Sequence, residues 1–230
     1  YVAQHMPCPM MLVQPTEGLA ESYSKQRIAP MIATSPALKK IISDVKARGS
    51  GNTILDKQFP GGMLMLVGAN APTRLASSPI RVLACDEVDR YPASAGTEGD
   101  PVTLAKQRTA GFQNRKVILT STPTVEGESR IATAFEEGDQ RRFFVPCPHC
   151  GTMQVLMWAG FHIRRTGDRV DDVNYFCGAG ADAYRAAYPA STIPGIDGEG
   201  CGAEIQEWRK NAFLEGGEWR PTASGSTGTH

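Results

Sequence analysis

Two adjacent carboxylates stand at the end of a short apolar run near the middle of the sequence. Residues 82–85 read Val-Leu-Ala-Cys, and Asp86 and Glu87 follow directly. If this run is a buried strand, it carries both acids to the edge of a sheet. There the first carboxylate can help hold Mg²⁺ and the second can polarise an attacking water, as in the Walker B segment of an ATPase. The alternative is an ordinary boundary between a strand and a turn.

A cluster of hydroxyls ends a second apolar run about thirty residues later. Thr120, Ser121 and Thr122 follow residues 117–119 and precede Pro123. In helicase-like ATPases such a segment lies on the strand beside Walker B, where its hydroxyls sense the γ-phosphate. The alternative is a strand followed by a turn in which Ser or Thr bonds its own backbone. The two motifs together, on neighbouring strand–helix units, favour the ATPase interpretation.

Four of the six cysteines have spacings that suit a metal. A Cys-Pro-His-Cys-Gly element is typical of a zinc knuckle, because its turn lets two thiolates face one ion at about 2.3 Å. Two further cysteines, each followed by glycine, resemble a second knuckle opened by an insertion. His149 and His162 are possible substitutes, and a remnant without metal is the alternative. The predicted ligands of a structural Zn²⁺ are Cys147, Cys150, Cys177 and Cys201.

Apolar runs and turn residues predict the elements that position these motifs. Proline follows Ser35 and Asp100, which indicates two helix starts, and Thr16 can cap another helix. A further helix is predicted over residues 129–137. Strands and helices alternate over residues 10–145, which favours an α/β domain with a mainly parallel sheet. The predicted strands cover residues 10–13, 54–59, 63–67, 82–85, 116–119 and 143–145, with 116–119 buried.

The pattern changes after Pro146, where short strand-like pieces lie among glycines. We therefore predict an ATPase core over residues 1–146 and a zinc-ribbon-like insert over 147–205. A helix near 206–214 and a linker complete residues 206–230. The stretch 178–200 is rich in Gly, Ala and Ser and is predicted to be an inserted loop.

Composition excludes some classes of protein. The 24 basic and 24 acidic residues balance, so net charge gives no sign of nucleic-acid binding. No apolar run approaches the roughly 20 residues that cross a bilayer, and no membrane association is expected. The G-x-x-x-x-G-K-[ST] phosphate loop is absent from the sequence. We expect a P-loop-type core that is incomplete at its N-terminus, a fragment of a longer protein that does not bind ATP tightly alone.

Some charged residues allow two interpretations. Arg74 and Arg81 flank the predicted Walker B strand, and either could contact a phosphate or DNA, although a solvated surface is expected for Arg81. Asp168, Asp171 and Asp172 could suggest a two-metal nuclease. Arginines surround these three acids in the sequence, which favours an exposed turn instead.

The combination resembles one family, the GpA-type large terminase subunit of tailed bacteriophages. The resemblance covers nearly the whole chain. It departs from the family at Ala76, where arginine is frequent and for which Arg74 could compensate, and at the insertion in the second knuckle. The matching segments are residues 12–16, 59–62, 66–70, 86–92, 120–123, 143–151 and 217–221.

The resemblance implies an ATP-driven motor that cuts concatemeric viral DNA and pumps it into a prohead. It also implies that the phosphate loop and the nuclease carboxylates lie outside both ends of this chain, with residues 206–230 leading toward the nuclease domain. Asp86 would ligate Mg²⁺, Glu87 would activate water, and Thr120, Ser121 and Thr122 would couple hydrolysis to DNA movement. The implied partners are double-stranded DNA, the portal protein, the small terminase subunit and further copies of the chain, in the cytoplasm of the infected bacterium. Such a motor grips phosphates, so its binding should be salt-sensitive and largely independent of sequence.

Two other functions remain open from the residues. One is a helicase-like nucleic-acid ATPase without a capsid, and a second helicase-like domain would support it. The other is a non-enzymatic binding module stabilised by zinc, from a degenerate prophage gene. It would be supported if Glu87 proved dispensable while loss of Cys150 unfolded the chain.

Overall fold

A computed structural model describes residues 1–43, 51–125, 127–158, 161–178 and 200–225, with the side chain of His162 outside that set. The chain divides into two compact units, Tyr1–Ala134 (the first unit) and Phe135–Gly228 (the second unit). The division falls before the predicted boundary at Pro146. The reason is that the strand ending at Pro146 pairs only with later strands of the described chain.

The first unit contains a five-stranded sheet in the order β2-β3-β1-β4-β5. Strands β1, β3, β4 and β5 run parallel, and β2 forms an antiparallel hairpin with β3. This confirms the predicted α/β fold with a mainly parallel sheet. The strands are β1 (Pro9–Gln14), β2 (Asp56–Phe59), β3 (Gly62–Gly68), β4 (Val82–Asp86) and β5 (Lys116–Thr120).

Both faces of this sheet are covered, because neighbouring strand residues point to opposite sides. Met11 and Val13 of β1 belong to the larger core cluster, which also includes Leu83 of β4. Leu12, between them, packs against a smaller cluster with Leu66 of β3 at its centre. The central strands are therefore apolar without interruption, as expected for a parallel sheet buried on both faces.

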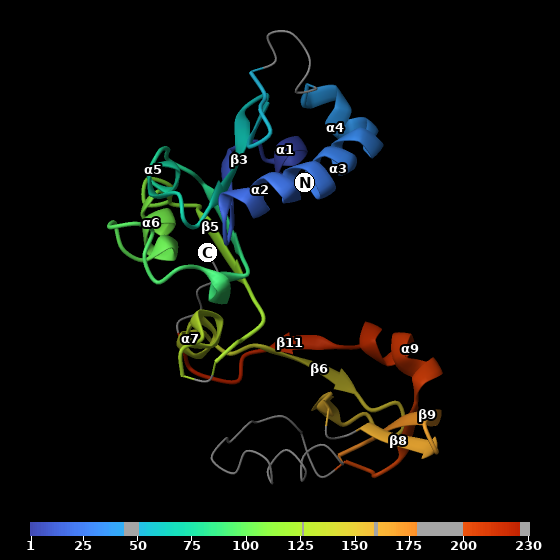
Figure 1. The fold of residues 1–230 in the computed structure, drawn as a ribbon. Coiled ribbons are helices and arrows are strands. Elements are labelled where there is room, and N and C mark those ends of the chain that lie inside the picture. Colours follow the sequence, from blue (N-terminus) through green and yellow to red (C-terminus); the bar gives the residue numbers. More distant parts are fainter. Residues whose placement is uncertain (44–50, 126, 159–160, 179–199, 226–230) are drawn as a thin grey trace. The chain divides into compact units, whose positions relative to one another are not determined.

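Helices cover the two faces of the sheet (Figure 1). Residues of α6 contribute to the larger cluster, and residues of α2 and of the π-helical turn η1 contribute to the smaller one. Every helix in the described part of the chain is too short or too polar to cross a membrane. The helical elements of this unit are α1 (Val2–His5), α2 (Glu17–Tyr23), η1 (Ser24–Ile28), α3 (Ala29–Thr34), α4 (Pro36–Ile41), α5 (Pro72–Leu75), η2 (Val88–Arg90), α6 (Pro101–Gln107) and α7 (Arg130–Glu137), whose last turn belongs to the second unit.

The predicted helix starts are confirmed. Hydroxyl oxygens of Thr16 and Ser35 accept hydrogen bonds from the first turns of α2 and α4, and the Asp100 carboxylate does the same for α6. The π-helical turn η1 ends at Ile28, two residues before Pro30. Proline has no N–H to continue the α-helical ladder, so a local change of winding is expected at this position.

Strand β5 is less buried than predicted. It forms the outer edge of the sheet, and β4 is its one partner among the described residues. Val117 and Leu119 pack against the core, whereas Lys116 and Thr120 are exposed. Ile118 keeps 41% of its surface exposed, although it is a large apolar residue. An apolar sequence alone does not distinguish a central strand from an edge strand.

The second unit consists of two small antiparallel sheets, β11-β6-β7 and β10-β9-β8. Its buried core joins Val145, Tyr175, Ile205 and Phe213 to two cysteines. The helix predicted over residues 206–214 is present but begins as a 3₁₀ turn, η4. The elements are β6 (Arg142–Pro146), β7 (Met153–Val155), β8 (Phe161–Thr166), β9 (Arg169–Phe176), β10 (Glu204–Gln206), η4 (Glu207–Arg209), α9 (Lys210–Glu215) and β11 (Glu218–Arg220).

Candidate functional site

Polar residues end the parallel strands of the first unit at one edge of the sheet. Gln14 is the last residue of β1, Asp86 of β4 and Thr120 of β5. The strand register pairs Val13 with Cys85 and Asp86 with Thr120, so the three polar side chains stand in one row. The carboxyl edge of an open α/β sheet is where such folds bind ligands.

Asp86 receives a hydrogen bond on each carboxylate oxygen. Gln14 Nε2 donates to Oδ2 at 3.0 Å, and Thr120 Oγ1 lies 2.8 Å from Oδ1. Both neighbours are neutral, so they fix the orientation of Asp86 without cancelling its charge. A positioned carboxylate at a strand end suits Mg²⁺, which takes one or two carboxylates and fills its shell with water and phosphate oxygens. Gln14 was not predicted, although it is a polar residue ending an apolar strand, as Asp86 is.

Glu87 adopts a left-handed backbone, with φ 56° and ψ 48°. A residue with a Cβ pays roughly 1–3 kcal/mol for such a conformation, which persists only where surrounding contacts impose it. Its carboxylate lies 3.3 Å from the Nε of Arg90, whose side chain is 69% exposed. Such an exposed ion pair is weak. Glu87 is therefore held by its backbone, with a carboxylate that water can reach.

The segments that follow β4 and β5 are bonded to each other. The backbone N–H of Asp89 donates to Ser121 Oγ at 3.2 Å. In return, the backbone N–H of Thr124 donates to Asp89 Oδ2 at 3.1 Å. The Ser121 hydroxyl also donates to the carbonyl of Thr122 at 3.3 Å. Two of the three predicted coupling residues thus lie in one hydrogen-bonded network with the turn after Glu87.

Tyr91 connects the same turn to the centre of the sheet. Its hydroxyl donates to the carbonyl of Val13 at 2.9 Å, and the side chain is buried. Burial raises the pKa of Tyr91 above its ordinary value, so the hydroxyl keeps its proton and acts as a donor. The turn is therefore attached to β1 as well as to the segment after β5.

The two predicted arginines have different positions. Arg74 on α5 forms an ion pair with Asp56 of β2, with 2.8 Å between NH2 and Oδ1. Its contact with phosphate or DNA stays a prediction. Arg81 precedes β4 and therefore stands at the amino edge of the sheet, opposite to Asp86. Its Nε donates to the carbonyl of Asn114 at 3.3 Å.

The three acids that could suggest a nuclease, Asp168, Asp171 and Asp172, lie in the hairpin of β8 and β9. Asp171 and Asp172 are residues of β9, and the predicted exposed turn is the end of this hairpin. Asp172 Oδ2 lies 2.8 Å from NH2 of Arg164, and Asp171 Oδ1 lies 3.7 Å from Nε of Arg169. Neighbouring arginines therefore face both acids, as the sequence indicated.

The structure brings all four predicted cysteine ligands together. Their Sγ atoms lie within 4.8 Å of one another. The sulfurs of Cys147 and Cys201 are 3.8 Å apart, and so are those of Cys150 and Cys177. Sulfurs placed tetrahedrally about 2.3 Å from one ion would be about 3.8 Å apart. The cluster has the ligand set and the spacing of a four-cysteine metal site.

Tight turns present the cysteines. In the first knuckle, the N–H of Gly151 donates to the carbonyl of Cys147 at 2.9 Å, and Gly151 has φ +76°. In the second, the N–H of Gly202 donates to the carbonyl of Cys177 at 3.1 Å. Pairing of β9 with β10 brings the chain back beside Cys177. Residues 179–199, which include most of the predicted inserted loop, lie outside the described residues.

Of the two histidine alternatives, the structure describes the side chain of His149 alone. His149 Nε2 lies 3.0 Å from the carbonyl oxygen of Glu204, and its backbone N–H donates to Cys147 Sγ at 3.4 Å. The ring of His149 is therefore engaged outside the sulfur cluster. The side chain of His162 lies outside the described residues.

The thiols of the cluster differ in acidity. Burial raises the pKa of Cys147, and it raises that of Cys177 to about 12. Hydrogen bonds with Thr152 lower the pKa of Cys150 to about 6. Cys150 is thus available as a thiolate at neutral pH. Binding of a metal ion would drive the two buried thiols to release their protons to solvent and to ligate as thiolates.

A mainly parallel α/β sheet with an Asp-Glu pair at one strand end and hydroxyls at the next is the arrangement of an ATPase-type domain. The protein-family comparison agrees, since the phage terminase large subunit gpA, ATPase domain, matches residues 1–219. The chain belongs to this family.

Two large terminase subunits of phages are similar in sequence to this chain. The large terminase subunits of Enterobacteria phage P21 and Escherichia phage lambda are 29% and 30% identical to this chain over 183 residues, which is 77% of the chain. The chain spans 28% of the length of these curated relatives. Among solved structures, a mutant of the large terminase ATPase domain of Thermus phage P74-26 is 16% identical. That alignment covers 56% of this chain and 53% of the other, with a TM-score of 0.37.

Proposed function

We propose that the first unit hydrolyses ATP within a terminase large subunit and that this hydrolysis drives viral DNA into a prohead. The observation that carries the proposal is the arrangement around Asp86. Neighbouring strands β1 and β5 each orient one of its oxygens, and Glu87 follows in an imposed left-handed backbone. Membership in the terminase ATPase family supports the same reaction.

Each acid has a separate role in this proposal. Asp86 would hold Mg²⁺ through a carboxylate oxygen, and that ion would neutralise charge on the transferring phosphoryl group. Glu87 would orient the attacking water and accept its proton, since its carboxylate is accessible and only weakly paired with Arg90. Thr120 would respond to hydrolysis through its hydrogen bond to Asp86. Ser121 and Thr122 would then couple that response to DNA movement.

The sequence lacks the phosphate loop that this chemistry needs. Such a loop follows a strand, and its glycines cradle phosphates at the carboxyl edge of the sheet. Within the described residues, no strand pairs with the outer edge of β5. We propose that a strand elsewhere in the parent protein pairs there, which would bring its loop beside Thr120 and Asp86. Exposed Ile118 would then be covered.

In the second unit, we propose a structural Zn²⁺ bound by the four cysteines. A site closed by four protein thiolates has no open position for a substrate, so its role would be to stabilise the fold. The small buried core of this unit, in which Cys147 and Cys177 are themselves members, supports a stabilising role.

The remaining partners are proposed from the relatives. The parent protein would act on double-stranded DNA with the portal protein and the small terminase subunit, as an oligomeric motor in the cytoplasm of the infected bacterium. Cutting of concatemeric DNA would belong to parts of the parent protein beyond this chain. Arg74 is retained as a possible contact to phosphate or DNA once its pairing with Asp56 is broken.

The test is DNA-stimulated ATP hydrolysis by the intact gene product, wild type beside Glu87→Gln. Loss of the water-orienting carboxylate should lower the rate by about 100-fold or more, while nucleotide binding is retained. Glu98→Gln, at an exposed loop position, is the matched control and should hydrolyse like wild type. Equal rates for Glu87→Gln and wild type would mean that the acids are only a strand end, and the zinc-stabilised binding module would then be preferred.

A further inference from the structure

The turn after Glu87 is attached to helix α7 by its acidic side chain. Asp89 Oδ1 accepts a hydrogen bond from the backbone N–H of Ile131 at 2.9 Å, in the first turn of α7. Its other oxygen accepts the N–H of Thr124. One carboxylate therefore joins the segment after β4, the segment after β5 and the start of α7.

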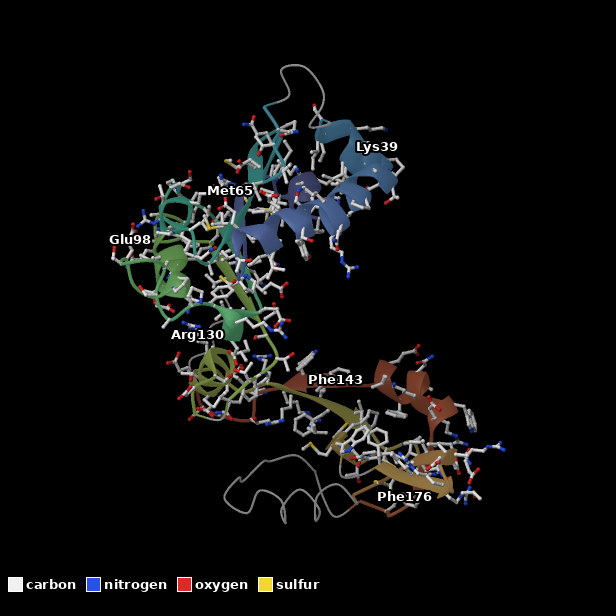
Figure 2. All side chains as sticks on the ribbon, viewed as in Figure 1. Lys39, Met65, Glu98, Arg130, Phe143 and Phe176 are labelled. Carbon is white, nitrogen blue, oxygen red and sulfur yellow. The ribbon has the colours of Figure 1, made fainter. Side chains whose placement is uncertain are left out.

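The reverse attachment comes from α7 itself. Figure 2 labels Arg130 at the start of this helix. Its guanidinium bonds back to the same turn. NH1 donates to the carbonyls of Val88 at 3.2 Å and Tyr91 at 3.0 Å, and NH2 donates to that of Pro92 at 2.9 Å. Nε lies 3.3 Å from Oδ1 of Asp100, which caps α6. The planar guanidinium spreads five N–H donors over three nitrogens, so it can bond these three carbonyls and face Asp100 at the same time.

Charge strengthens both halves of this arrangement. Burial alone would raise the pKa of Asp89, but hydrogen bonds from Ser129 and from the amides of Ile131 and Thr124 outweigh it, and the pKa lies below its ordinary value. Asp89 is thus ionised at neutral pH. Its negative charge at the N-terminus of α7 is also attracted to the positive end of the helix dipole, which stabilises the contact.

Both attachments lie within five residues of Glu87. The left-handed backbone of Glu87 needs surrounding contacts that impose it. Asp89 and Arg130 fix the residues immediately after it, and they do so by binding α7 rather than the sheet. A shift of the Glu87 backbone therefore cannot occur without stretching hydrogen bonds to α7.

We propose that Asp89 and Arg130 form a reciprocal clamp that positions Glu87 and transmits its displacement during ATP turnover to α7. This route branches at Asp89 from the segment after β5, because the backbone N–H of Asp89 also donates to Ser121 Oγ. From there it leads along the chain toward the second unit, because the last turn of α7 belongs to that unit. The inference rests on the proposed ATPase function. Asp89 and Arg130 are positioning residues.

The test compares Asp89→Asn, Arg130→Lys and the control Glu137→Gln, an exposed acid on the same helix, in the intact gene product. Asn can accept one of the two amide bonds but turns an N–H₂ group toward the other. Lys offers three N–H donors on a single nitrogen, whereas Arg130 faces three carbonyls and Asp100 from three nitrogens. DNA-stimulated turnover should fall by about ten-fold or more in either clamp variant, the scale of one charge-assisted hydrogen bond. Nucleotide affinity and the control should match wild type.

Hydrogen exchange separates coupling from simple stabilisation. In wild type, a non-hydrolysable ATP analogue with Mg²⁺ should change exchange both near Thr120 and in α7. In the clamp variants the change near Thr120 should remain and the change in α7 should disappear. The inference would be overturned if the nucleotide analogue left hydrogen exchange in α7 of the wild type unchanged. It would also be overturned if the clamp variants matched wild type in turnover and exchange. Glu87→Gln distinguishes this result from failure of the ATPase proposal, because its own loss of activity tests that proposal alone.

Discussion

The two units of this chain build their sites in opposite ways. In the first unit, parallel strands of one sheet carry Gln14, Asp86 and Thr120 to a common edge, so the site is a consequence of the fold. In the second unit, two of the buried core residues, Cys147 and Cys177, are themselves proposed ligands. There we expect the fold to depend on the site. A mutation or a chelator should therefore affect the two units very differently.

The largest expected effect is on the second unit when metal is removed. Binding of a structural zinc contributes folding free energy directly, up to about 10–16 kcal/mol in zinc-finger peptides. A strong chelator should remove one Zn²⁺ per chain and abolish slow hydrogen exchange in β6 to β11, while β1, β3 and β4 keep theirs. Cys201→Ala should reproduce this result, and Cys8→Ala, a buried cysteine of the first unit, should not. Unchanged exchange after chelation would contradict the proposed dependence.

A large-to-small substitution in the sheet core should destabilise the first unit and leave the second unit unchanged. Leu83 of β4 is fully buried in the larger core cluster, so Leu83→Ala should destabilise the first unit by roughly 2–5 kcal/mol. Zinc content should not change. Ile118→Ala on β5 is the matched comparison and should cost less than about 1 kcal/mol, because that residue is 41% exposed. Hydrogen exchange at β1 and β4 measures both, and equal losses would contradict the edge position of β5.

The pH dependence of zinc binding should reflect the buried thiols. Burial raises the pKa of Cys147 and that of Cys177 to about 12, so both free thiols are protonated near neutrality. Zinc must displace these protons, and falling pH favours the protonated form. Affinity should therefore rise with pH between 6 and 8, by up to about 100-fold per unit if two protons are released. Competition with a zinc-sensitive dye measures this, and a pH-independent affinity would argue against thiolate ligation by these residues.

The smallest expected effect is at the strand edge of the first unit. Thr120→Val keeps the shape of the side chain and removes the hydroxyl 2.8 Å from Asp86 Oδ1. Loss of one hydrogen bond costs roughly 0.5–1.5 kcal/mol, so Mg²⁺-dependent hydrolysis should weaken by roughly 2- to 10-fold. Titration of Mg²⁺ in the ATPase assay measures this weakening as a change in the Mg²⁺ concentration that gives half-maximal hydrolysis. Thr34→Val at the end of α3 should leave the titration unchanged.

Local sequence signals predicted most elements of the first unit. Caps at Ser35 and Asp100 are short-range features, because a side chain and an amide three residues later decide them. The strand ends at Asp86 and Thr120 are equally local, since an apolar run stops at a polar residue. The burial of β5 was predicted wrongly, because exposure of Ile118 depends on which strands lie beside it.

Long-range contacts explain what sequence reasoning missed. Gln14 lies 72 positions from the carboxylate that it orients, and Arg130 lies 42 positions from the Val88 carbonyl that it bonds. Gln14 stands in the family-like segment 12–16, but neither that segment nor the sequence around Arg130 assigned the residue a role. A glutamine after a strand or an arginine at a helix start is common, and only the partner brought to it by the fold gives it a role.

The sequence by itself determined the residue types and their local settings: an Asp-Glu pair and a hydroxyl cluster that end apolar strands, and four cysteines in glycine turns. These follow from short-range propensities and from burial patterns along the chain. Only the tertiary structure decided that Gln14 and Thr120 orient Asp86, that Asp89 and Arg130 bind each other's segments, and that Cys177 and Cys201 meet despite the residues between them. Strand order and register set these distances, and they depend on the packing of the whole unit rather than on any one segment.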